Sequence, residues 1–318
     1  MLTASLAIIV GLVVLVWSAD RFVLGAAATA RHFGMSPLLI GMTIVSLGTS
    51  APEIFVSATA SLEGSGILAI GNALGSNITN VGLVLGITAL IAPLPIQGRM
   101  LKKEIPILLL VTVIAGLVLQ DFVLGFWDAI VLMVCLVITL FWLFHESNDQ
   151  EIGGLDEEEV AAIEQTSTAK SIMWLVVGLG ALMISAQLLV WGAVEVATYF
   201  GISELIIGLT IVAIGTSLPE LAASVASALK GHHDIAIGNV VGSNIFNLLA
   251  VMPIPGLVAS TAIEKEVLFR DYGTMLIITV LLIAFVYLFR RKGRVGRSAG
   301  SVLLLAYASY LGLLLFQA

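Results

Sequence analysis

Apolar segments of about twenty residues follow one another along almost the whole chain, and they limit what it can fold into. A segment of that length crosses the hydrocarbon core of a bilayer as a helix. Only 11% of the 318 residues are charged, against roughly 25% in an average soluble domain. We therefore expect an all-α polytopic membrane protein without a separate soluble domain. The segments predicted to span the membrane are ten: 3–30, 37–60, 67–91, 104–120, 122–144, 171–199, 204–228, 235–258, 271–290 and 300–317.

The basic residues predict the orientation of these spans, because Lys and Arg collect in cytoplasmic connections. If the first connection is cytoplasmic, the inside connections hold eleven Lys and Arg and the outside connections hold two. Both termini are then expected outside, in the periplasm of a bacterial cell whose inner membrane holds the protein. The connection 145–170 would be cytoplasmic and carries eight acidic residues against Lys170. We interpret it as a solvated linker, with cation sensing as the alternative.

A shift of 167 residues aligns the sequence with itself, without a gap, from Ser18 with Ser185 to Asn80 with Asn247. GMTIVSLGTSAPE (41–53) and GLTIVAIGTSLPE (208–220) agree at nine of thirteen positions, and IGNALGSNITN (70–80) and IGNVVGSNIFN (237–247) at eight of eleven. The copies lie five spans apart, an odd number, so the second is inserted upside down. Inverted repeats are a transporter architecture with the substrate site near the midplane.

This repeat predicts the domain organisation. We expect ten transmembrane helices arranged as two inverted five-helix repeats. The first would comprise residues 1–144 with its motif at about 41–80, and the second residues 171–318 with its motif at about 208–247. The acidic linker 145–170 would join them.

Each motif places a carboxylate and a proline at membrane depth. A charge there costs roughly 2.5–3.5 kcal/mol on insertion scales, and proline removes a backbone hydrogen bond. Pro52 is expected to free carbonyl oxygens between Ser46 and Thr49, while Thr49 and Glu53, four residues apart, share a helix face. In the next span one face carries Asn72, Ser76 and Asn80. The second copy supplies Thr216, Ser217, Glu220, Asn239, Ser243 and Asn247.

These groups offer oxygen atoms to a ligand, and all-oxygen sites suit hard cations such as Ca²⁺, which takes about 6–8 ligands. Two carboxylates balance one divalent ion, but they could equally hold Na⁺ or bind protons. The glycines of GNALG and GNVVG also have the spacing of close helix packing. Packing alone does not account for the polar residues between them.

The paired motifs GTSAPE and GTSLPE, with GNALGSN and GNVVGSN, resemble the two α-repeats of the sodium/calcium exchanger family over nearly the whole chain. The short central connection resembles that of the prokaryotic members. The resemblance implies a core of spans 2, 3, 7 and 8, across which spans 1 and 6 slide to alternate access. It also implies a set of cation ligands: Glu53, Glu220, Thr49, Thr216, Ser50, Ser217, Ser76, Ser243, Asn80, Asn247 and the carbonyls of Ser46 and Ala213.

One position departs from the family pattern. Many relatives carry an aspartate in one repeat at the Asn80 and Asn247 pair, whereas both residues are amides here. The predicted site therefore contains only two acids, and the ion stoichiometry of the family does not carry over.

We expect an antiporter that exchanges Na⁺ for Ca²⁺, with both ions bound as substrates in the bilayer and no cofactor. A Ca²⁺/H⁺ antiporter that uses the same two glutamates is the alternative. The inverted repeat disfavours a cation channel, and the four histidines all lie in connections, so no base is available to a nucleophile and no enzyme is expected. Neither a nucleic acid nor an obligate protein partner is implied.

Overall fold

The structure is a computed structural model that describes residues 1–95, 103–145, 167–202, 207, 211, 213–288 and 294–317. The acidic connection, apart from its ends, and most of the sequence from 203 to 212 lie outside these residues. Within them, seven helices are long and apolar enough to cross a membrane, or eight if one bent pair counts as a single span. The chain is thus a multi-pass integral membrane protein, and the total of ten spans stays a prediction.

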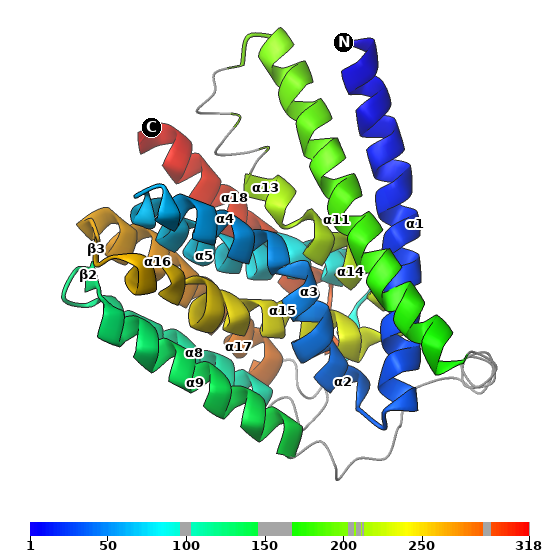
Figure 1. Cartoon of the computed structure of the whole chain (residues 1–318), viewed down its shortest axis with the longest axis horizontal. Coiled ribbons are helices and arrows are strands. Elements are labelled where there is room, and N and C mark those ends of the chain that lie inside the picture. The colour runs from blue at the N-terminus through cyan, green and yellow to red at the C-terminus, as the bar shows by residue number, and fades with distance from the viewer. Residues whose placement is uncertain are drawn as a thin grey trace.

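Helices α1 (Leu2–His32) and α11 (Thr168–Tyr199) form a long pair inclined to the rest of the molecule (Figure 1). Glycine lets them approach closely. A Cβ atom on Gly178 would lie 2.6 Å from the backbone N of Phe22, and one on Gly192 would lie 2.7 Å from the Ala4 carbonyl oxygen. Small residues at such crossings allow close packing in membranes, where the hydrophobic effect between helices is absent.

Two interrupted helices form the centre. The first consists of α5 (Gly66–Thr79), the π-helix η2 (Asn80–Leu85) and α6 (Gly86–Ile91). The second consists of α15 (His233–Phe246), the π-helix η5 (Asn247–Val251) and α16 (Pro253–Val258). In their most apolar stretches 72% and 94% of residues are buried, against 22% in α9 (Phe126–His145). They therefore form the core, and α9 belongs to the lipid-facing periphery.

The two GTSxPE motifs lie on broken helices. The first follows α2 (Pro37–Ile40), the π-helix η1 (Gly41–Val45) and α3 (Ser46–Thr49), then continues after Ser50 as α4 (Ala51–Leu62) with a bend of 43°. The second breaks at Ser217 between α13 (Ala213–Thr216) and α14 (Leu218–Leu229). The predicted interruption at each proline is confirmed, because both prolines fall in the first turn of the second segment, where a missing N–H is tolerated.

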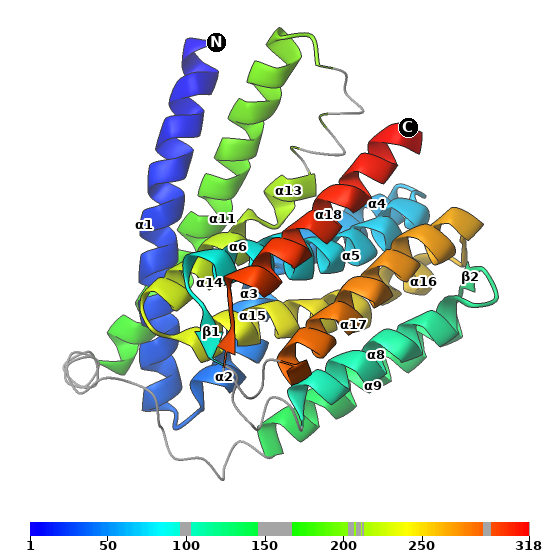
Figure 2. The same cartoon turned by 180° about the vertical axis from the view of Figure 1, so that it is seen from behind.

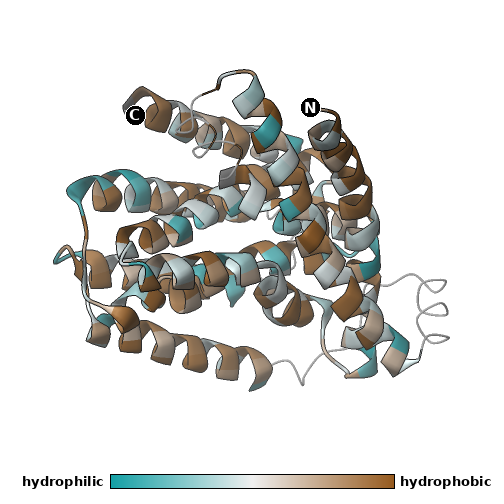
Figure 3. Ribbon diagram, turned by 45° about the horizontal axis from the view of Figure 1, so that its top comes forward, coloured by the Kyte–Doolittle hydropathy of each residue, from teal (hydrophilic) through white to brown (hydrophobic). Residues whose placement is uncertain are grey.

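The remaining helices cover the core. From behind, α17 (Gly273–Leu288), which continues the π-helix η6 (Val267–Tyr272), and α18 (Arg297–Gln317) lie across α5 and α6 (Figure 2). Helices α8 (Glu104–Leu119) and α9 complete the periphery. Apolar colour runs along the outer helices, and hydrophilic colour gathers at helix ends and in the middle (Figure 3). The outer surface is thus suited to lipid.

Two short antiparallel strand pairs, which the sequence did not predict, tie connections together. Strand β1 (Leu94–Pro95) pairs with β4 (Arg294–Val295), and β2 (Val123–Leu124) pairs with β3 (Thr261–Ala262). Each pair joins the first half of the chain to the second. Residues 94 and 261 are themselves 167 apart.

Candidate cation-binding site

The two helix breaks bring the predicted acids to the middle of the molecule. Glu53 lies in the first turn of α4 and Glu220 in the first turn of α14. Both side chains are only 1% exposed. They are close enough to interact electrostatically across the interface between the two halves. A carboxylate pair buried at membrane depth requires compensation, because each charge is costly there.

Hydroxyl groups reach these carboxylates from both halves. The Ser50 hydroxyl donates to Oε1 of Glu220 at 3.4 Å, and the Thr49 hydroxyl also interacts with Glu220. On the other side, Ser76 of α5 donates to Glu53. The structure therefore brings the first motif's hydroxyls to the second motif's acid. In the second copy Ser217 and Ser243 are buried and Thr216 is half-buried.

Two amides hold the backbone of the glutamates in place. Asn72 donates from Nδ2 to the Glu53 carbonyl at 3.1 Å and to the Ser57 hydroxyl at 3.0 Å. Asn239 makes the same two contacts in the second half, to the Glu220 carbonyl at 3.3 Å and the Ser224 hydroxyl at 3.0 Å. Ser57 and Ser224 escaped the sequence analysis. Their signal is a serine four residues after each glutamate.

The second amide also links the two halves. Its Oδ1 atom accepts a hydrogen bond of 3.1 Å from the Thr49 hydroxyl. Asn239 thus connects α15, α14 and α3 around Glu220, and it acts as a positioning residue rather than as an open ligand.

Several buried oxygens of the predicted set have no hydrogen-bond partner among the described residues. They are Oε2 of Glu53 and of Glu220, the hydroxyls of Ser217 and Ser243, and the side-chain amide atoms of Asn80 and Asn247. An unsatisfied buried polar group costs about 1–3 kcal/mol, and a charged one more. Orphaned oxygens gathered on four neighbouring elements are therefore what a cation site needs.

The Ser46 carbonyl differs from the expectation that the proline releases it. It accepts the backbone N–H of Ser50 at 2.9 Å and the Thr49 hydroxyl at 3.4 Å. In the second half the Ser217 N–H donates to the Ile214 carbonyl at 3.1 Å, so this bond is shifted by one residue from Ala213. The two breaks are not identical in backbone structure.

The asparagine pair sits at a second irregularity. Asn80 begins η2 and Asn247 begins η5. π-Helical turns shift the backbone hydrogen bonds from i+4 to i+5 and are frequent at functional sites. The sequence analysis found the two asparagines but not this turn, for which no residue pattern gives a signal.

A further amide pair, also missed, lies one turn earlier. Asn77 donates from Nδ2 to the Asn244 carbonyl at 3.1 Å, and both residues are at most 2% exposed. They join α5 to α15 directly. Both carry the same position of the repeat, which was the available signal.

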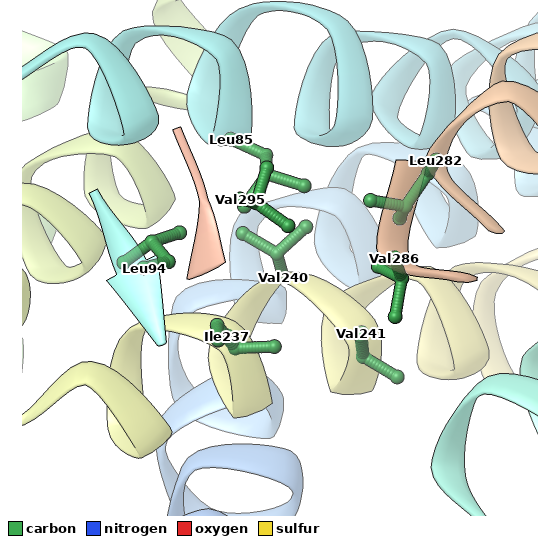
Figure 4. Close-up of a pocket in the computed structure, with 8 residues that line it drawn as sticks. All are labelled: Leu85, Leu94, Ile237, Val240, Val241, Leu282, Val286 and Val295. Carbon is green, nitrogen blue, oxygen red and sulfur yellow. The ribbon is translucent and has the colours of Figure 1, made fainter. Parts of the chain in front are cut away.

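The donor set is composed of oxygen atoms. Among the described residues no group of three or more His, Cys, Asp and Glu is placed to hold a metal ion. Such a set favours Ca²⁺ or Na⁺ over softer metals. A separate cavity of about 10 Å³ is lined only by aliphatic residues, among them Leu85, Val240 and Leu282 (Figure 4). It offers no ligand to an ion and belongs to the packed core.

Comparison with known proteins places this arrangement. The family model described as "Sodium/calcium exchanger protein" matches residues 3–145 and 170–316. CaxA of Alkalimonas amylolytica, which is named as an antiporter, is 45% identical over 98% of both chains. The inner membrane protein YrbG of Escherichia coli is 41% identical over 99% of this chain and 97% of its own.

A solved structure agrees over the same length. The sodium-calcium exchanger NCX_Mj, soaked with 10 mM Na⁺ and 10 mM Sr²⁺, superposes with a TM-score of 0.83 at 33% identity and covers 98% of both chains. The resemblance read from the motifs is therefore confirmed. The chain belongs to the sodium/calcium exchanger family of membrane antiporters.

Proposed function

We propose that the protein exchanges Na⁺ for Ca²⁺ by alternating access, with both ions competing for the oxygens around Glu53 and Glu220. The observation that carries this proposal is the pair of buried, unpartnered Oε2 atoms of these glutamates. One Ca²⁺ neutralises the two carboxylates, and so do two Na⁺ ions. A site that is costly when empty favours a change of access only when it is loaded, which is the property of an exchanger.

The ligands we propose are the twelve groups of the family motif: Glu53, Glu220, Thr49, Thr216, Ser50, Ser217, Ser76, Ser243, Asn80, Asn247 and the carbonyls of Ser46 and Ala213. The Ser46 carbonyl keeps a second lone pair for an ion while it accepts the Ser50 N–H. The ions are cargo, and we propose no resident cofactor and no obligate protein partner.

We infer two inverted five-helix repeats and ten spans, with the apolar helices α8 and α14 crossing alongside the longer ones. Equivalent contacts 167 residues apart support this arrangement. Asn72 with Ser57 repeats as Asn239 with Ser224. Gly11 against Leu189 repeats as Gly178 against Phe22. The strand pairs join β1 to β4 and β3 to β2, as a two-fold axis would require.

Unequal packing of the two halves supports alternating access. Helix α1 packs along α14, where Leu15, Ala19 and Phe22 share an apolar cluster with Ala223. The equivalent helix α11 makes no comparable packing along α4. In the orientation given by the basic residues, with both termini outside and the protein in the inner membrane, α14 is the cytoplasmic half of its span. The cytoplasmic side would then be closed and the outer side open.

Inside-out vesicles test the proposal. Vesicles loaded with Na⁺ should take up external ⁴⁵Ca²⁺, and vesicles with a sodium-free lumen and an imposed proton gradient should not. Uptake driven by protons alone would replace Na⁺ with H⁺ as the counter-ion and leave the two glutamates as the site. Uptake that survives in Glu53→Gln would overturn the site itself.

A further inference from the structure

A salt bridge connects the α1–α11 pair to the core. Nζ of Lys230 lies 2.6 Å from Oδ1 of Asp20, and the two side chains are 26% and 40% exposed. Asp20 is on α1, whereas Lys230 is the C-cap residue of α14. A cation at a helix C-terminus is also favoured by the helix dipole. The bridge therefore fastens α1 where it packs on α14.

The same segment of α1 is fixed to α11. The guanidinium of Arg21 lies 5.2 Å from the centre of the Trp174 ring, and the rings of Trp17 and Trp174 pack edge to face with centroids 6.2 Å apart. With the glycine contacts described above, these interactions make α1 and α11 one unit. The bond between Asp20 and Lys230 is thus a link between that unit and the core.

The repeat shows what this link becomes in the opposite state. A shift of 167 residues relates Asp20 to Gln187 and Lys230 to Glu63. Glu63 is the C-cap residue of α4, as Lys230 is of α14. Gln187 and Glu63 are both exposed in the present conformation. When inverted repeats exchange conformations, α11 packs on α4 and brings Gln187 to Glu63. A neutral amide and a carboxylate make no ion pair.

We propose that Asp20 and Lys230 form a one-sided latch that favours the state in which α1 packs on α14. The opposite state lacks its counterpart and places Glu63 at a helix C-terminus, where the dipole disfavours an anion. The two access states are therefore unequal in energy before any ion binds. The latch rests on the alternating access proposed above, but not on which ions are carried.

Cysteine accessibility in detergent-solubilised full-length protein, without Na⁺ or Ca²⁺, tests the latch. Ala223 is fully buried against α1, so a cysteine there reacts with a maleimide only when α1 leaves α14. In an Ala223→Cys, Cys135→Ser background, Asp20→Asn and Lys230→Gln should each raise the labelling rate by up to about fivefold, the range of partly exposed ion pairs. The double variant should be no faster than the faster single one.

Exchange of the two charges supplies the rescue. Asp20→Lys with Lys230→Asp should return the labelling rate toward that of the parent. Wild-type labelling rates in both single variants, with unchanged thermal unfolding, would overturn the latch.

The symmetry makes a second, opposite test. Gln187→Lys should create the missing bridge to Glu63 in the other state and accelerate labelling at position 223 by a similar factor. Glu63→Gln should abolish that gain, but change nothing in the parent background, which makes it the matched control. No response to Gln187→Lys would overturn the one-sided character. Labelling that responds as expected in a protein that moves neither Na⁺ nor Ca²⁺ would instead reject the proposed ions and leave the latch in place.

Discussion

The hydroxyl of Ser50 donates to Oε1 of Glu220 at 3.4 Å, across the boundary between the two halves of the chain. One helix break thus supplies a donor to the acid that follows the other break. The equivalent hydroxyl, that of Ser217, has no hydrogen-bond partner among the described residues. Two groups that the repeat makes equivalent therefore differ in what they do before an ion arrives.

This difference predicts unequal effects of serine removal. Ser50→Ala should lower the ion-free stability by about 1 kcal/mol, because a buried hydrogen bond is lost and a carboxylate oxygen loses its donor. Ser217→Ala should leave the ion-free stability unchanged or raise it, since only an unsatisfied hydroxyl is removed. Thermal unfolding in detergent without Na⁺ or Ca²⁺ measures both.

Added Ca²⁺ separates this structural effect from ion binding. If both hydroxyls are ligands, both variants should show a smaller Ca²⁺-induced rise in unfolding temperature than the parent. Equal stability losses for the two variants in ion-free buffer would contradict the asymmetry seen here.

Neutralising either glutamate should uncouple stability from transport. Glu53→Gln and Glu220→Gln each remove half the charge that holds a divalent ion, which is worth several kcal/mol even at an effective dielectric constant of about 20. Uptake of ⁴⁵Ca²⁺ into vesicles should fall to background. The ion-free unfolding temperature should stay the same or rise, because a neutral amide costs less to bury than a carboxylate.

Glu63→Gln is the control for these two variants, because Glu63 is also on α4 but exposed. Its uptake should match that of the parent. A Glu53→Gln protein that binds Ca²⁺ with parental affinity would show that the buried oxygens serve another purpose.

A third acid in the site should change the preference between the ions. Asn247 is fully buried, and neither of its side-chain amide atoms has a partner among the described residues. Asn247→Asp adds a charge that attracts Ca²⁺ twice as strongly as Na⁺ by Coulomb's law. We expect at least about a tenfold gain in Ca²⁺ affinity over Na⁺, equal to about 1.4 kcal/mol, and a less stable ion-free protein.

Competition of Na⁺ with ⁴⁵Ca²⁺ binding measures that ratio. Asn244→Asp is the matched control, because Asn244 is equally buried one turn earlier on the same helix but lies outside the proposed ligand set. An unchanged ratio in Asn247→Asp would remove Asn247 from the site.

The sequence was sufficient to predict the acids, the helix breaks and the pairing of the two motifs, because each is written twice at a constant separation. Duplication turns a single buried glutamate, which has many explanations, into a two-fold site with few. The repeat could have shown Ser57 and Asn77 in the same way, since both are duplicated as Ser224 and Asn244.

Other features depend on tertiary structure and could not be read from the sequence. The π-helical turns at Asn80 and Asn247 arise from the way the central helices pack, and residue type does not encode an i+5 hydrogen bond. The bridge between Asp20 and Lys230 joins residues 210 positions apart, in a contact that only one conformation makes. The Ser46 carbonyl shows the opposite error, because proline at the start of a helix removes no bond that this carbonyl had.

The close crossing of α1 and α11 gives the last prediction. A Cβ atom on Gly178 would lie 2.6 Å from the Phe22 backbone N, whereas one on Gly180 meets no described atom within 4 Å. Both glycines lie in the same stretch of α11, so alanine gains the same helix propensity at either position. Gly178→Ala should destabilise the protein by about 1–3 kcal/mol, the usual cost of overpacking, and Gly180→Ala should not. Because the clash forces the two helices apart, Gly178→Ala should also slow ⁴⁵Ca²⁺ uptake more than Gly180→Ala. Equal unfolding temperatures for the two variants would show that α1 and α11 are not held together at this crossing, and the pair could then not move as one unit.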